Sequence, residues 1–136
     1  KIKALNVIDI NDPENLPLID LNSLNSISMM AKEKDFVENL IDGYIKDVSR
    51  IIKDITIFVD DKNYHDISDL SHALDGSSRS IGAKRLSKVA DKMYQLATSR
   101  KQHISPQNIE ELNVTFSETK SALYEFIKNK KSASLL

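Results

Sequence analysis

Apolar residues recur every three to four positions along most of this chain, which is the period of helices that bury one face. The longest periodic stretch, residues 32–60, runs for about seven helical turns. The same period covers residues 64–81, residues 83–99 and a last segment that begins at Pro106, directly after Ser105, a residue suited to cap a helix. Because the links between these segments are short, the pattern predicts an all-α fold, an antiparallel up-and-down four-helix bundle.

The two ends of the chain lack a sustained period. Residues 1–17 mix apolar and turn-forming residues, which predicts a linker or an N-terminal arm. Residues 18–30 are expected to add one short extra helix to the bundle. Basic and polar residues follow the last apolar position, so residues 131–136 are expected to form a frayed tail. The helical domain is therefore expected to span residues 18–130.

The composition supports one small domain and narrows its partners. A chain of 136 residues can bury one core and is too short for two. Its few glycines, prolines and aromatic residues favour long helices over a sandwich or barrel. A net charge of −1 gives no electrostatic basis for binding nucleic acid or an anionic membrane, and the absence of cysteine excludes thiol redox chemistry. No apolar run approaches the roughly 20 residues of a membrane span. We therefore expect protein partners and a cytoplasmic location.

One histidine stands apart on the predicted helix 64–81. With about 100° between successive residues, Leu74 and the other apolar positions form a core-facing stripe, and His72 lies about 170° from its centre. The imidazole is therefore expected in solvent. Gly76 follows one turn later on nearly the same side, where the missing Cβ allows another protein to come close. Because a glycine inside a helix costs about 1 kcal/mol relative to alanine, its place beside an exposed histidine indicates a docking surface.

The run from His72 to Ala83, His-Ala-Leu-Asp-Gly-Ser-Ser-Arg-Ser-Ile-Gly-Ala, resembles the signature of histidine-containing phosphotransfer (HPt) domains. The resemblance implies a helical-bundle module that relays phosphoryl groups between the aspartates of receiver domains, with His72 as the phosphoacceptor. It also implies that Gly76 belongs to the docking surface. The remaining motif positions are expected to serve the structure; they are Leu74, Ser77, Gly82 and Ala83.

The expected function is that of a phosphorelay intermediate. A mostly neutral imidazole at pH 7 can attack an aspartyl phosphate, and this transfer depends on positioning more than on covalent assistance. The resemblance implies that the receiver supplies both the aspartate and Mg²⁺, so no cofactor is expected in this domain. The sequence contains no glycine-rich phosphate loop of the kinase or P-loop type, and we therefore expect no kinase activity of its own.

One position departs from the HPt pattern. The family usually has a lysine or arginine three residues after the histidine, whereas this chain has Asp75. An exposed aspartate would place like charge near the incoming phosphate, at a cost of order 1 kcal/mol. Arg79, two turns from His72 and about 20° from its direction, is the candidate substitute for the missing cation. The other candidates for the docking face are Ser68 and Asp69.

A second function remains open because of Asp75. The bundle could serve as a docking module that binds a receiver or an enzyme partner without efficient phosphotransfer. Sensor kinases of the quorum-sensing RpfC kind resemble this layout, with a C-terminal HPt-type domain that also binds an enzyme. The chain begins with Lys1, which is expected of a domain excised from a longer parent, such as a bacterial hybrid sensor histidine kinase. The receiver could then lie in the same parent chain. A bundle that only dimerises would leave His72 and Gly76 unexplained.

Two further residues are interpreted structurally. His65 precedes His72 by seven residues and shares its face, but Asp69 is the only further ligand nearby, and a metal site needs a third and a fourth. We therefore expect no bound metal.

Gly43 lies inside the predicted helix 32–60 and is interpreted as a point of close helix packing.

Overall fold

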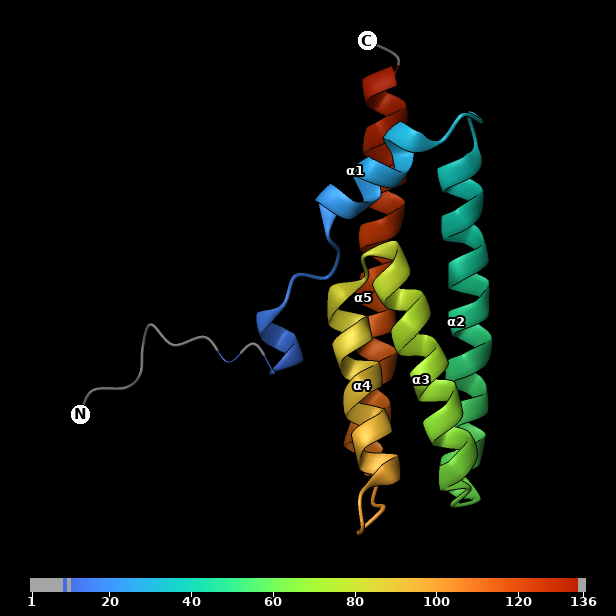
Figure 1. The fold of residues 1–136 in the computed structure, drawn as a ribbon, viewed down its shortest axis with the longest axis vertical. Helices are drawn as coiled ribbons and strands as arrows, with labels where there is room; N and C mark the ends of the chain where they lie inside the picture. Colours follow the sequence, from blue (N-terminus) through green and yellow to red (C-terminus); the bar gives the residue numbers. More distant parts are fainter. Residues whose placement is uncertain (1–8, 10, 135–136) are drawn as a thin grey trace, which may run out of the picture.

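The computed structural model describes residue 9 and residues 11–134, and this part of the chain forms helices and no strands. Helices α2 to α5 run side by side as the predicted antiparallel four-helix bundle, which confirms the fold class, and α1 crosses one end of α5 (Figure 1). Among the helices of the described residues, none combines the length and the apolar character of a membrane span. The elements are η1 (Pro13–Asn15), α1 (Leu21–Met30), α2 (Phe36–Asp60), α3 (Tyr64–Ile81), α4 (Lys84–Thr98) and α5 (Pro106–Ser134).

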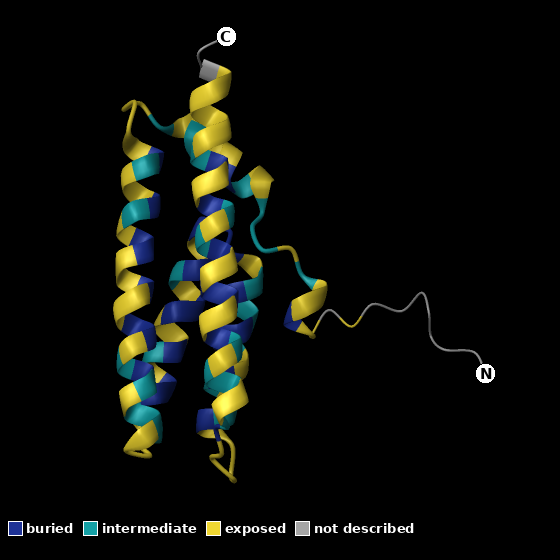
Figure 2. Cartoon of the chain, turned by 180° about the vertical axis from the view of Figure 1, so that it is seen from behind, coloured by how far each residue is buried: buried dark blue, intermediate teal, exposed yellow. Residues whose placement is uncertain are grey.

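The core is built from the apolar stripes of all five α-helices. Figure 2 shows the buried positions on the inner faces of the helices and the exposed positions outside. Each fully buried leucine or isoleucine contributes about 1.5–3 kcal/mol through the area that it removes from water. The side chains with no exposed surface include Leu24, Ile41, Ile55, Ile67, Leu74, Leu86, Leu112 and Leu123.

The largest differences from the predicted helix boundaries lie at the start of α2 and at the end of α5. Helix α2 begins at Phe36 and not at residue 32, because residues 32–35 are exposed, polar and bury no apolar side chain. Helix α5 continues to Ser134, beyond the point where the sequence predicts a frayed tail. An ion pair of 3.1 Å between Lys131 Nζ and Glu38 Oε1 ties this end of α5 to α2. Residues 135–136 of the predicted tail, and residues 1–8 and 10 of the predicted arm, lie outside the described residues.

The segment before α1 lies along α4 and the α3–α4 turn. The Arg85 Nε donates to the Leu16 carbonyl at 2.9 Å, and the Asp20 backbone N–H donates to the Gly82 carbonyl at 2.7 Å. Gly82 ends α3 with a φ of 84°, the left-handed conformation that favours glycine. A Cβ there would lie 3.1 Å from the Ser23 Cβ, so Gly82 also permits the close approach of α1.

Candidate functional site

His72 lies in the middle of α3 with its imidazole exposed, as the helical period predicts. Ala73 and Gly76 beside it are also exposed. A Cβ built on Gly76 would meet no atom within 4 Å, so the surface next to the histidine is open. The site is therefore a single imidazole on a surface of small side chains, accessible to the surface of another protein.

An aromatic residue that the sequence pattern did not single out contacts the histidine. The Tyr94 ring, from α4, lies with its centroid 5.8 Å from that of the His72 imidazole, and the two ring planes are tilted by 48°. The contact depends on how α3 and α4 pair. Because a helical wheel describes one helix at a time, it gives no signal for such a contact.

Asp75 lies on the side of α3 that faces α4, and its placement differs from the exposed position expected from the sequence. The residue is buried, and its Oδ1 accepts a hydrogen bond of 2.5 Å from the Ser87 hydroxyl of α4. Its two carboxylate oxygens also accept from Arg79 Nη2, at 3.0 and 2.9 Å. The carboxylate is thus paired with a cation and directed at α4, so it presents no unpaired negative charge to a phosphate at His72.

Arg79 remains 74% exposed at its side chain although it pairs with Asp75. The guanidinium is held at Asp75 and does not extend freely toward His72, which is two turns away. Its remaining N–H groups still face solvent, where a bound partner could reach them.

The other predicted docking residues lie on the N-terminal half of α3. Ser68 is buried, and its hydroxyl donates to the His65 carbonyl at 2.8 Å, so its only hydrogen is already used. Asp69 is exposed, and its Oδ2 lies 3.4 Å from the Nε2 of His65. Asp69 therefore shares the exposed face of His72, whereas Ser68 faces inward.

Three potential metal ligands meet at the start of α3. His65, Asp66 and Asp69 each place a ligand atom within 4.8 Å of the others. The sequence pattern indicates only His65 and Asp69, and the structure adds Asp66. Asp66 also accepts a hydrogen bond of 2.6 Å from the Asn63 side-chain amide. A structural zinc site is closed by four ligands, and the described residues bring three to this exposed surface.

Gly43 on α2 lines an open groove against α3, so its interpretation as a point of close helix packing is wrong. A Cβ on Gly43 would meet nothing within 4 Å. The groove has a volume of about 510 Å³ and lies along the C-terminal half of α3. Leu40 at its edge is 39% exposed, an apolar side chain available to a partner. The groove is lined by Asn39, Leu40, Gly43, Tyr44 and Asp47 of α2 and by Ser77, Ser80 and Ile81 of α3.

A buried hydroxyl pair joins α2 to α3 beneath this groove. The Tyr44 Oη lies 2.6 Å from the Ser78 Oγ, and both residues are buried. Burial raises the pKa of Tyr44 to about 12. The Tyr44 hydroxyl therefore keeps its proton throughout the physiological range, and the pair holds the floor of the groove in place.

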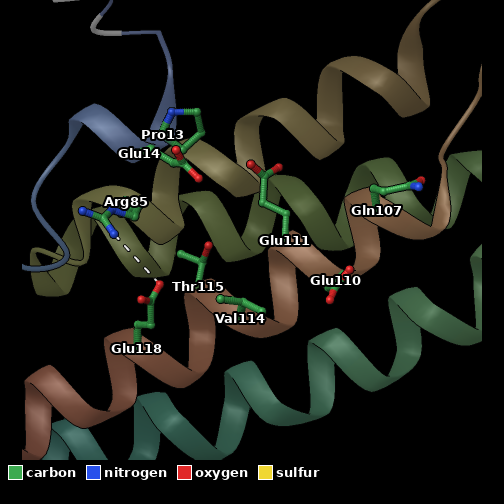
Figure 3. Close-up of a pocket in the computed structure, with 9 residues that line it drawn as sticks. All are labelled: Pro13, Glu14, Arg85, Gln107, Glu110, Glu111, Val114, Thr115 and Glu118. Atoms are coloured by element: carbon green, nitrogen blue, oxygen red, sulfur yellow. Dashed lines mark ion pairs between the residues drawn. The ribbon is translucent and has the colours of Figure 1, made fainter.

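A second pocket, of about 560 Å³, lies between η1, α4 and α5 (Figure 3). No residue of α3 lines it. An ion pair of 3.9 Å joins Arg85 Nη1 and Glu118 Oε1, and Glu14, Glu110 and Glu111 add further carboxylates. Carboxylates repel phosphate. We therefore place the candidate site at His72 and not in this pocket.

An exposed imidazole on a helical bundle, beside a glycine that leaves room for a partner, defines a class of phosphotransfer modules. The family model described as the Hpt domain matches residues 39–123, which is more than half of the chain. The chain therefore belongs to the Hpt family, and the resemblance found in the motif from His72 to Ala83 is confirmed. The match includes most of α2, all of α3 and α4, and the larger part of α5. Among curated proteins, no sequence matches this chain.

Solved structures of phosphotransfer proteins share the fold. The histidine-containing phosphotransfer protein HptB from Pseudomonas aeruginosa PAO1 matches with a TM-score of 0.74 and 18% identity, over 83% of this chain and 96% of HptB. Yeast Ypd1 matches with a TM-score of 0.59 and 29% identity, over 66% of this chain and 55% of Ypd1. Saccharomyces cerevisiae Ypd1, crystallised with the receiver domain of the response regulator Ssk1, gives a TM-score of 0.62 and 20% identity, over 86% and 95% of the two chains.

Proposed function

We propose that His72 accepts a phosphoryl group from the aspartyl phosphate of a receiver domain and passes it to the aspartate of another receiver. The observation that carries this proposal is the exposed imidazole of His72 beside the open surface at Gly76. In the forward step the unprotonated ring nitrogen forms a bond to phosphorus while the bond from phosphorus to the aspartate oxygen breaks. The carboxylate leaves with the electron pair, and the other ring nitrogen keeps its hydrogen.

The receiver is proposed to cover His72, Gly76 and the groove between α2 and α3. Leu40 gives this face an apolar edge, and Gly43 leaves the groove open. A face that combines apolar and polar side chains suits a protein partner. A related Hpt-fold protein, Ypd1, was crystallised with a receiver domain, which supports the choice of this partner class. Mg²⁺ is proposed to come with the receiver, since this surface needs only to supply the nucleophile.

The pairing of Asp75 favours transfer over a docking module without transfer. The alternative was based on an exposed aspartate close to the incoming phosphate. Asp75 is instead buried and held by Ser87 and Arg79, so its charge is compensated within the domain. The alternative therefore loses the feature that suggested it.

The source of the phosphoryl group is proposed to be a kinase outside this domain, in the same parent chain or in a separate protein. The sequence contains no glycine-rich phosphate loop with which to bind a nucleotide. The proposed location is the cytoplasm, because a relay of this kind requires ATP-dependent kinases and receiver domains in the same compartment.

The test is transfer of radiolabelled phosphate to this chain from a panel of phosphorylated receivers. The native chain is compared with His72→Gln and with two matched controls, His65→Gln and His103→Gln, which alter other exposed histidines. We expect acid-labile, base-stable label on the native chain and both controls, and none on His72→Gln. A folded native chain that binds receivers without gaining label would overturn the proposal in favour of the docking module.

A further inference from the structure

The ring contact between His72 and Tyr94 concerns how the nucleophile is held. The centroid distance of 5.8 Å falls within the range of favourable contacts between aromatic rings, and the tilt of 48° lies between the stacked and the edge-to-face arrangements. Among residue 9 and residues 11–134, no side chain forms a hydrogen bond or an ion pair with the His72 imidazole. Within the described residues, the contact with the Tyr94 ring is therefore the one ring contact that restrains the His72 imidazole.

We propose that Tyr94 is a positioning residue for phosphotransfer: its ring packs against the His72 imidazole and holds it in one orientation toward the docked receiver. The inference rests on the proposed function of His72 as the phosphoacceptor. An exposed histidine inside a helix can otherwise populate about two rotamers around χ1, because the third would clash with the preceding turn. Since phosphoryl transfer depends on in-line placement of the nucleophile, a single orientation raises the fraction of productive encounters.

Tyr94 is itself placed by the pairing of α3 with α4. Ser87 and Tyr94 lie two turns apart on the same face of α4, and Ser87 donates to the buried Asp75 of α3. Side chains on a helix lean toward its N-terminus, so the Tyr94 ring extends back along α4 toward His72. Met93 beside it is buried in the core, which fixes the rotation of α4. Asp75 thus has a structural role: it sets the register that brings Tyr94 to His72.

The aromatic ring, and not the hydroxyl, carries the proposed effect. Tyr94→Phe is therefore expected to behave like the native chain, whereas Tyr94→Leu and Tyr94→Ala lose the effect. Tyr124→Ala is the matched control, because Tyr124 is a 47% exposed tyrosine on α5. The leucine variant retains apolar volume at position 94, so the inference can still be tested where the alanine variant does not fold.

The first readout is spectroscopic and needs no receiver. The ring current of Tyr94 should displace the NMR signals of the His72 ring protons from those of an exposed histidine. We expect the displacement to persist in Tyr94→Phe and Tyr124→Ala and to vanish in Tyr94→Leu and Tyr94→Ala. Ring-proton signals that are the same in the native chain and in Tyr94→Ala would overturn the contact.

The second readout compares two phosphoryl donors. Phosphoramidate is a small donor that can reach the imidazole in any rotamer, so its rate of loading His72 should be the same in all variants. A docked receiver requires one orientation, and the maximal transfer rate of Tyr94→Leu and Tyr94→Ala should fall about twofold with KM unchanged. Native transfer rates in the alanine and leucine variants, or a Tyr94→Phe variant as slow as Tyr94→Ala, would overturn the inference.

These readouts separate the inference from the proposed function. If the native chain is loaded by phosphoramidate yet accepts nothing from any receiver, the proposed function fails while the NMR comparison still reports on the contact of Tyr94 with His72. If receivers transfer to the native chain and to Tyr94→Ala at equal maximal rates, only the positioning role is overturned.

Discussion

The two sides of α3 differ. On the side that faces α4, polar and aromatic side chains contact α3 near His72. On the side that faces α2, an open groove lies above the buried hydroxyl pair of Tyr44 and Ser78. The α4 side holds Asp75 in contact with Ser87 and brings Tyr94 to the imidazole. The α2 side leaves room at Gly43. One helix thus separates two tasks: its α4 side fixes the nucleophile, and its α2 side offers space for a partner.

The largest expected effect concerns the hydroxyl pair on the α2 side. Burial raises the pKa of Tyr44 from 10.0 to about 12, so above pH 10 the unfolded chain loses a proton that the folded chain retains. The contribution of the Tyr44 hydroxyl to the free energy of unfolding is fully present below pH 10. About 3 kcal/mol of this contribution is lost as the pH rises from 10 to 12. Urea unfolding of the native chain and of Tyr44→Phe should give a difference in unfolding free energy that shrinks between pH 10 and pH 12. A difference independent of pH would contradict the burial of this hydroxyl.

On the α4 side, removing the Asp75 carboxylate should cost about 1–3 kcal/mol of stability, because Ser87 and Arg79 lose their acceptor. Asp75→Asn retains an oxygen for Ser87 and should lose less than Asp75→Ala. Thermal and urea unfolding should rank the three chains as native, then Asn, then Ala. An alanine variant as stable as the native chain would show that Asp75 does not join the two helices.

Filling the open surface beside His72 should weaken docking without unfolding the domain. Gly76→Gln places a long side chain where a Cβ meets nothing within 4 Å, and the receiver KM should rise about tenfold, which equals about 1.4 kcal/mol. Ser49→Gln, an exposed position on the side of α2 that faces α5, is the control and should leave KM unchanged. Equal KM values for the two variants would place the docking surface elsewhere.

The smallest effect is a stabilisation at Gly43. Alanine there meets no atom within 4 Å and improves helix propensity, so Gly43→Ala should raise the free energy of unfolding by up to about 1 kcal/mol. The same substitution at Gly82 should have the opposite sign, because φ is 84° and the new Cβ would crowd Ser23. Chemical denaturation of both variants measures whether the free energy of unfolding rises for Gly43→Ala and falls for Gly82→Ala. A destabilised Gly43→Ala would restore the interpretation of close helix packing at Gly43.

The helix that carries His72 was predictable because its limits are set locally. A polar turn at residues 60–63 precedes it and Gly82 follows, so the predicted span 64–81 agrees with α3. The histidine's exposure and the burial of Leu74 followed from the helical period alone.

Features that depend on two helices were not predictable. The burial of Asp75 and the contact of Tyr94 require the register between α3 and α4, which a single helical wheel does not contain. Gly43 was misinterpreted for the same reason, since the sequence does not show whether a neighbouring helix covers it. The end of α5 was missed because its ion pair involves Glu38, far away in the sequence.

The most direct test of the account is to locate the phosphate after incubation of the native chain with a phosphorylated receiver, by mass spectrometry under conditions that preserve phosphohistidine. The account predicts phosphate on His72, with His65 and His103 unmodified. Phosphate on another residue, or receiver binding with no phosphate gained, would contradict it.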